Sequence, residues 1–162
     1  MSDTLPPLRR VVTGHDAAGL GTISIEDAGQ SLLFAGGQAT FTLMWSTASS
    51  PADNNDARDG AQRRIGLTSP GGTALRIVDF APGSRSPMHR THSLDYGIVL
   101  EGEIDLELEG GETRRLRPGD IVVQRGTNHA WICGSRAARM AFVLIEASPV
   151  RVGLEMLPEI HP

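Results

Sequence analysis

The sequence has little cysteine and no long apolar run, and these absences exclude several classes of protein. Cys133 is the only cysteine among 162 residues, which excludes an internal disulfide and a thiolate-rich zinc site. A bound metal would therefore need histidine, carboxylate and water ligands. The apolar stretch at 141–145 is far shorter than the roughly 20 residues that cross a bilayer, so we expect no membrane segment.

The chain also lacks an excess of positive charge. Its formal charge is −4 at pH 7, which provides no electrostatic footprint for a phosphate backbone. Residues 1–10 carry two prolines and two arginines without a following apolar core, so they do not form a secretory signal. The chain shows no helix-turn-helix pattern for binding DNA. We therefore expect a cytoplasmic protein that has neither nucleic acid nor a membrane as a partner.

Turns and alternating apolar residues are what the sequence does contain. Its 19 glycines and 10 prolines divide the chain into short segments in which apolar residues recur mostly at every second position. Because no long amphipathic helix separates these segments, the pattern predicts one all-β domain, a sandwich or barrel. The expected strands are 75–80, 96–100, 104–108, 120–123, 129–132 and 140–145, with further strands at 10–13, 21–25 and 41–46.

The regions around these strands suggest how the chain divides. We expect 1–64 to pack on the barrel or exchange with it, 65–148 to form the barrel, and 149–162 to lie outside it as a tail. Between 46 and 63 the sequence is polar, which indicates a surface loop or a short helix begun by Ser50 and Pro51. This segment is either a solvated connector or a mobile lid.

The first candidate motif is 83–102, GSRSPMHRTHSLDYGIVLEG. Gly83 is followed after five residues by His89, then by an acid, Asp95, and by Gly102 at the end. Residues six apart on a strand point to the same face, so His89 and Asp95 are both expected to point into a barrel.

The second candidate motif is 118–133, PGDIVVQRGTNHAWIC, in which a Pro-Gly-Asp turn opens a strand and Gly126 precedes His129. In this order the two motifs resemble the pair of signature motifs of the cupin family. The resemblance implies a double-stranded β-helix barrel, the cupin or jelly-roll fold, with a pocket for a metal ion or a small ligand. It also implies that His129 is the last metal ligand.

Together, His89, Asp95 and His129 make a candidate metal site. Neutral imidazole and carboxylate suit divalent Fe, Mn, Ni, Co, Cu or Zn, and two histidines with one acid resemble the facial triad that leaves coordination positions open. Asp95 is one methylene shorter than the usual glutamate of the family. It is a candidate ligand and the candidate catalytic base; the alternative is that it caps a turn or pairs with Arg90 or Arg76.

The expected position of the second family histidine, two residues after His89, is Thr91 in this chain, and the next histidine is His92. A shift of one residue turns a side chain to the opposite face of a strand. His92 is therefore a fourth candidate ligand only if a bulge re-aims it. Otherwise it is a loop histidine or lies at a dimer face.

Four residues are predicted to line the substrate pocket. Trp131 and Cys133 follow His129 at two and four residues, on its face of the strand. Phe142 belongs to an alternating apolar set that would close the apolar end of the cavity, and Thr91 takes the place of the second histidine. Core packing is the alternative for these apolar side chains.

The leading hypothesis from the sequence is a metal-dependent enzyme acting on a small oxygen-bearing or carboxylated molecule. The resemblance includes dioxygenases, decarboxylases, isomerases and lyases, and fold alone does not choose among them. It extends to small one-barrel cupins of unassigned role in bacteria and in fungal natural-product gene clusters. The rival hypothesis is a cupin that has lost its metal and only binds a small molecule. In either case we expect a homodimer, because pairing would cover exposed sheet edges.

Overall fold

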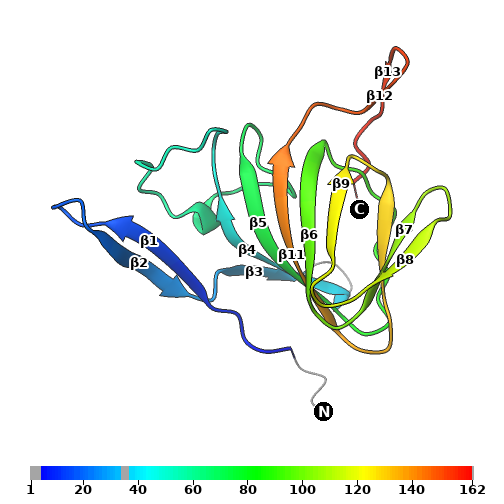
Figure 1. Ribbon diagram of the computed structural model, residues 1–162, viewed down its shortest axis with the longest axis horizontal. Helices are drawn as coiled ribbons and strands as arrows, with labels where there is room; N and C mark the ends of the chain where they lie inside the picture. Colours follow the sequence, from blue (N-terminus) through cyan, green and yellow to red (C-terminus); the bar gives the residue numbers. More distant parts are fainter. Residues whose placement is uncertain (1–4, 34–36, 162) are drawn as a thin grey trace.

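Two antiparallel sheets face each other across the core of this computed structural model, which describes residues 5–33 and 37–161 (Figure 1). The larger sheet has the strand order β3-β4-β5-β11-β6-β9 and the smaller one the order β10-β7-β8. The strands are β1 (Arg10–His15), β2 (Gly21–Asp27), β3 (Gln30–Leu33), β4 (Ala39–Ser46), β5 (Thr73–Phe80), β6 (Ser93–Glu101), β7 (Ile104–Leu108), β8 (Thr113–Leu116), β9 (Ile121–Arg125), β10 (His129–Cys133), β11 (Ala138–Glu146), β12 (Arg151–Val152) and β13 (Glu155–Met156). The predicted all-β jelly-roll barrel is confirmed.

Each expected strand overlaps an observed one, but two strands of the barrel sheets were not expected. β8 has the sequence TRRL, and its first three residues are exposed. It lacks the alternation of apolar and polar residues by which a half-buried strand is recognised. β3 is equally short and joins β4 at the edge of the larger sheet. β3 and β4 thus both belong to the barrel sheet itself.

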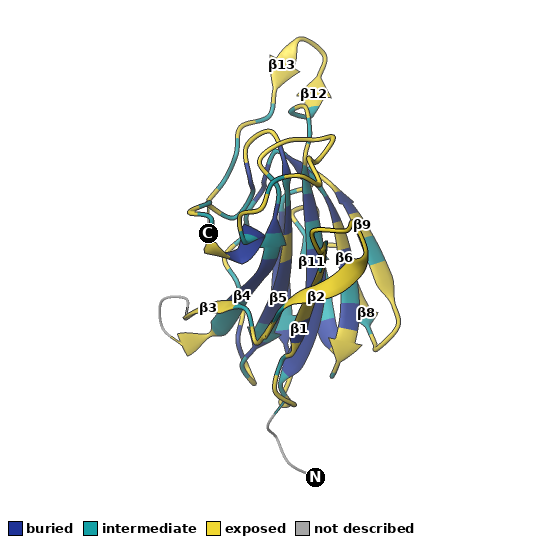
Figure 2. Cartoon of the chain, turned by 90° about the vertical axis from the view of Figure 1, so that its left-hand side faces the viewer, coloured by how far each residue is buried: buried dark blue, intermediate teal, exposed yellow. Residues whose placement is uncertain are grey.

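The core is centred on β11, which lies between β5 and β6 in the larger sheet. Met140 of β11 is paired with Val78 on one side and Val99 on the other, and all three are almost completely buried. Figure 2 shows the same central strands as the most buried part of the molecule. Burial of such a side chain contributes about 1.5–3 kcal/mol to stability, so this row holds the larger sheet against the smaller one.

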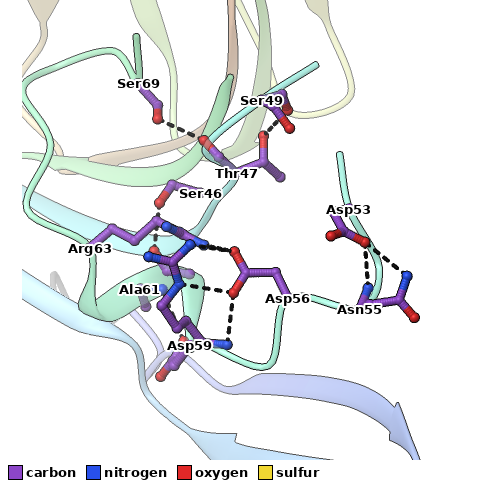
Figure 3. Close-up of polar contacts among 12 residues, drawn as sticks. Ser46, Thr47, Ser49, Asp53, Asn55, Asp56, Asp59, Ala61, Arg63 and Ser69 are labelled. Atoms are coloured by element: carbon purple, nitrogen blue, oxygen red, sulfur yellow. Dashed lines mark hydrogen bonds and ion pairs between the residues drawn. The ribbon is translucent and has the colours of Figure 1, made fainter. Parts of the chain in front are cut away.

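The polar segment after β4 is fixed to its surroundings by hydrogen bonds and ion pairs (Figure 3). The Ser46 hydroxyl donates to the Gly60 carbonyl oxygen at 2.6 Å, and Arg63 pairs with Asp56. The Asp59 side chain accepts from the Ala61 amide at 2.9 Å and so caps a 3₁₀ turn, η2 (Gly60–Gln62). The helical turn therefore begins after Asp59. Of the two forms expected for this segment, residues 50–59 form the surface loop and not the helix begun by Ser50 and Pro51.

Two hairpins extend from the barrel (Figure 1). β1 and β2 form one of them, and Arg10 at its base pairs with Asp27 and Asp59 at 2.6 and 2.7 Å. β12 and β13 form the other, after which the chain returns to pair Ile160 with Arg90. Within the residues described here, no helix is long and apolar enough to cross a bilayer.

Candidate active site

A cavity of about 370 Å³ lies inside the barrel. We call it the barrel cavity. Its wall includes inward-facing residues of β4, β5, β6, β9, β10 and β11, together with the segment 84–91 that precedes β6. The volume falls within the range of small-molecule pockets. Residues 46–63 do not contribute to its lining, which gives no support for a lid formed by that segment.

His89 and His129 meet on this wall although they come from different motifs. Their backbones form a β-bridge, with N···O distances of 2.9 Å from His89 to His129 and 3.0 Å in the reverse direction. The centroids of the two rings lie 4.2 Å apart. Strand pairing therefore places the two imidazoles side by side, as the sequence predicted.

Both rings are oriented by main-chain carbonyls. His89 Nδ1 lies 2.9 Å from the Pro87 carbonyl oxygen, and His129 Nδ1 lies 2.9 Å from the Thr127 carbonyl oxygen. A carbonyl only accepts, so each Nδ1 must carry the proton and each Nε2 keeps a free lone pair. This is the tautomer that binds a metal ion through Nε2 or accepts a proton from a ligand.

Burial keeps the two imidazoles neutral. It lowers the pKa of His129 to about 4, with repulsion from His89 as a further cause, and it also lowers the pKa of His89. A histidine must be neutral to bind a metal ion. The pair therefore has the protonation state of metal ligands at physiological pH.

Asp95 lies in the same cavity, directly opposite Gln124 in the pairing of β6 with β9. Asp95 Oδ1 and Gln124 Nε2 are buried without a hydrogen-bond partner among the described residues. Burial raises the pKa of Asp95 to about 6, and the hydroxyls of Ser93 and Thr91 lower it by a smaller amount. Buried polar atoms normally have partners, so this carboxyl and amide are suited to bind a polar group of a ligand.

Of the four residues predicted to line the substrate pocket, three do so. Thr91, Trp131 and Phe142 line the barrel cavity, with the rings of Trp131 and Phe142 packed edge to face at 5.5 Å. Cys133 does not line it. Its thiol is buried and lies 3.1 Å from the Arg136 carbonyl oxygen and 3.8 Å from the Phe80 carbonyl oxygen.

His92 is not brought to the cavity either. Its Nε2 lies 3.0 Å from the Leu157 carbonyl oxygen, and its amide donates to the Glu159 carboxylate at 3.0 Å. No bulge re-aims it toward His89. His92 lies at a bend just before β6 and not on a strand, and its ring contacts the returning C-terminal segment.

The geometry fits a divalent ion only in part. Two neutral imidazoles with free Nε2 atoms are suitable ligands, but no group of three His, Cys, Asp or Glu side chains in the described part of the chain is close enough to hold an ion. Asp95 therefore shares the cavity with the histidine pair without completing a triad in this structure. The full ligand set remains a prediction.

Arg76 and Gln124 are cavity residues that the motifs did not identify as site residues. Arg76 has a signal in the sequence, because it shares its face of the strand with the apolar residues Ala74, Val78 and Phe80. A charged residue in an inward-facing row is a candidate functional residue. Gln124 has no comparable signal.

Comparison with known proteins identifies the family. The family model described as cupin domain matches residues 76–146. The chain is 46% identical over 165 aligned positions to phomopsin biosynthesis cluster protein C′ of Diaporthe leptostromiformis, which covers 94% of this chain and 87% of that protein. The chain belongs to the cupin superfamily. This cupin is also 40% identical over 151 positions to the cupin-domain-containing oxidoreductase fogC of Aspergillus ruber, covering 88% of the cupin and 74% of that protein.

Solved structures show the same fold. The polyketide cyclase RemF of Streptomyces resistomycificus matches this cupin with a TM-score of 0.52 and 20% identity, over 78% of this chain and 81% of that one. The cupin domain of Cnp3 from Schizosaccharomyces pombe matches with a TM-score of 0.53 and 12% identity, over 86% and 88% of the two chains. The segment matched by the family model runs from β5 to β11 and includes the histidine pair, Asp95 and Arg76.

Proposed function

We propose that this cupin is an enzyme that acts on a small organic molecule in the barrel cavity. The observation that carries the proposal is the pair of neutral imidazoles, with both Nε2 atoms free, in the same apolar cavity as a carboxyl whose pKa is about 6. Relatives named as cupin-domain-containing oxidoreductases and biosynthesis cluster proteins support an enzyme of biosynthesis.

His89 and His129 would hold a divalent ion such as Fe, Mn, Ni, Co, Cu or Zn. When bound, the ion would polarise an oxygen of the substrate and leave positions open for it. The Pro87 and Thr127 carbonyls would hold the imidazoles in place, and Trp131 and Phe142 would keep water out. Asp95 would hold or transfer a proton at its free Oδ1, for which a pKa near the working pH is favourable.

Metal analysis of the full chain, purified without chelator, tests this proposal. We expect about one equivalent of a divalent ion per chain, because the two histidines are neutral at physiological pH and neutral imidazoles bind such an ion. Less than about a tenth of an equivalent, after incubation with Mn²⁺ and Zn²⁺ as well, would contradict metal dependence.

One observation favours a second function, a metal-free cupin that binds a small molecule without catalysis. It is the lack of a three-residue ligand group in the described residues. Under this alternative, ligand binding would persist in protein that contains no metal and cannot be loaded with one.

We also propose a homodimer. The β1–β2 hairpin projects from the barrel and exposes Val11 and Ile23, although an isolated two-stranded hairpin is marginally stable in water (Figure 1). A second copy would cover these side chains. We expect light scattering to give the mass of two chains, and the V11D/I23D double variant to give one chain with an unchanged barrel unfolding transition. A wild-type mass of one chain would contradict the proposal.

A further inference from the structure

Arg76 is a buried cation on the wall of the barrel cavity. It lies on β5 opposite Phe142 of β11 and is only 8% exposed. Burial lowers its pKa, but a guanidinium keeps its charge at any physiological pH. The cavity therefore contains a permanent positive charge among aromatic and aliphatic side chains.

No carboxylate of the described residues pairs with this guanidinium. Nε donates to the Leu67 carbonyl oxygen at 3.0 Å, and Nη2 donates to the Gly66 carbonyl oxygen. Asp95, which lines the same cavity, forms no ion pair with Arg76. The two carbonyls fix the plane of the guanidinium, and Nη1 has no hydrogen-bond partner among the residues that the structure describes.

The other buried arginines behave differently. Each of them faces at least one carboxylate: Arg10 pairs with Asp27 and Asp59, Arg90 with Glu109, and Arg139 with Asp79. A buried charge without a counterion is costly, and chains normally avoid it by pairing. Arg76 departs from this rule, and it lines the barrel cavity, where a ligand can supply the missing anion.

We infer that Arg76 anchors a carboxylate of the ligand, and that the ligand is an organic acid with an aromatic or flat apolar body. A carboxylate matches the fork of a guanidinium in two charge-assisted hydrogen bonds. The rings of Phe142 and Trp131 provide an apolar wall beside it. The Gly66 and Leu67 carbonyl oxygens around the guanidinium disfavour a more highly charged group such as phosphate. The inference rests on the proposed function only in taking this ligand as the substrate.

Binding of benzoate and benzamide to the full chain, measured by calorimetric titration after EDTA treatment, tests this inference. The two probes have nearly the same shape and differ in charge. We expect benzoate to bind about tenfold or more tightly than benzamide in the wild type, and the Arg76→Gln variant to lose this preference. Arg85→Gln is the matched control, because the Arg85 guanidinium also lines the cavity but is half exposed and paired with Glu107. It should keep the preference.

Equal affinities for the two probes in the wild type, including no measurable binding of either, would overturn the inference, as would an unchanged preference in Arg76→Gln. If that variant does not fold, Arg76→Lys, which keeps the charge but loses the fork, should show a reduced preference. A preference that vanishes with EDTA and returns with Mn²⁺ would place the carboxylate on the metal and also overturn the inference. A preference in protein that never binds metal would support Arg76 while contradicting metal dependence.

Discussion

Replacing His129 with asparagine is expected to lower the affinity for a divalent ion about a hundredfold or more. The reason is that His129 and His89 both line the barrel cavity as neutral imidazoles, with Nδ1 bonded to a carbonyl oxygen and Nε2 free to bind the ion. The same loss is expected for His89→Asn. Calorimetric titration of the chelator-treated protein with Mn²⁺ and Zn²⁺ measures it.

His92→Asn is the matched control for this prediction. His92 lies only three residues from His89 in sequence, but its ring contacts the Leu157 carbonyl oxygen. We expect the His92→Asn substitution to leave the metal affinity unchanged. An equal loss in the His92 variant, or full affinity in both cavity variants, would show that the ion binds elsewhere.

The Asp95→Asn variant is expected to be more stable than the wild type at pH 8 by roughly 3 kcal/mol, and nearly equal to it at pH 4. The pKa of Asp95 rises from 3.8 to about 6 on folding, because burial penalises the charged form. Between these values the folded state holds a proton that the unfolded state has released. Stability of the wild type therefore falls as pH rises through this window, and asparagine, which cannot ionise, removes the loss.

Urea unfolding at pH 4, 6 and 8 in the presence of EDTA measures this difference. The effect of His129 on stability has the opposite sign. Its pKa falls from 6.5 to about 4 on folding, so the free energy of unfolding decreases as pH falls through that range. His129 is present in both the wild type and the Asp95→Asn variant, so its effect cancels in the comparison. Glu112→Gln, at an exposed position before β8, is the control for the loss of one carboxylate. A variant at position 95 that is less stable than the wild type at pH 8 would contradict the burial argument.

The strands could be predicted because alternation of apolar and polar residues is a local pattern. The meeting of His89 and His129 was implied by the resemblance to the paired motifs of the cupin family, and the structure joins the two residues in a β-bridge. β8 escaped prediction because an exposed edge strand needs no apolar face. The sequence could not predict what tertiary packing decides. Trp131 and Cys133 share one face of the expected strand, yet of the two only Trp131 lines the cavity.

Individual side-chain partners were also beyond the sequence. Asp95 was a candidate to pair with Arg76 or Arg90, yet Arg90 pairs with Glu109 and Arg76 donates to main-chain carbonyls. Both alternatives were compatible with charge and distance along the chain. Only the register of β5, β11 and β6 separates the cation from the acid.

The carbonyl oxygens that orient the two imidazoles make the site tolerant of substitution at 87 and 127. Many proteins orient such rings with a carboxylate side chain, which a single substitution removes. Here the acceptors are peptide oxygens, at positions two residues before each histidine. Any amino acid at 87 or 127 supplies the same oxygen provided that the backbone path is kept. Substitution at 87, which lines the cavity, can therefore change the shape of the cavity while the two Nε2 lone pairs stay in place.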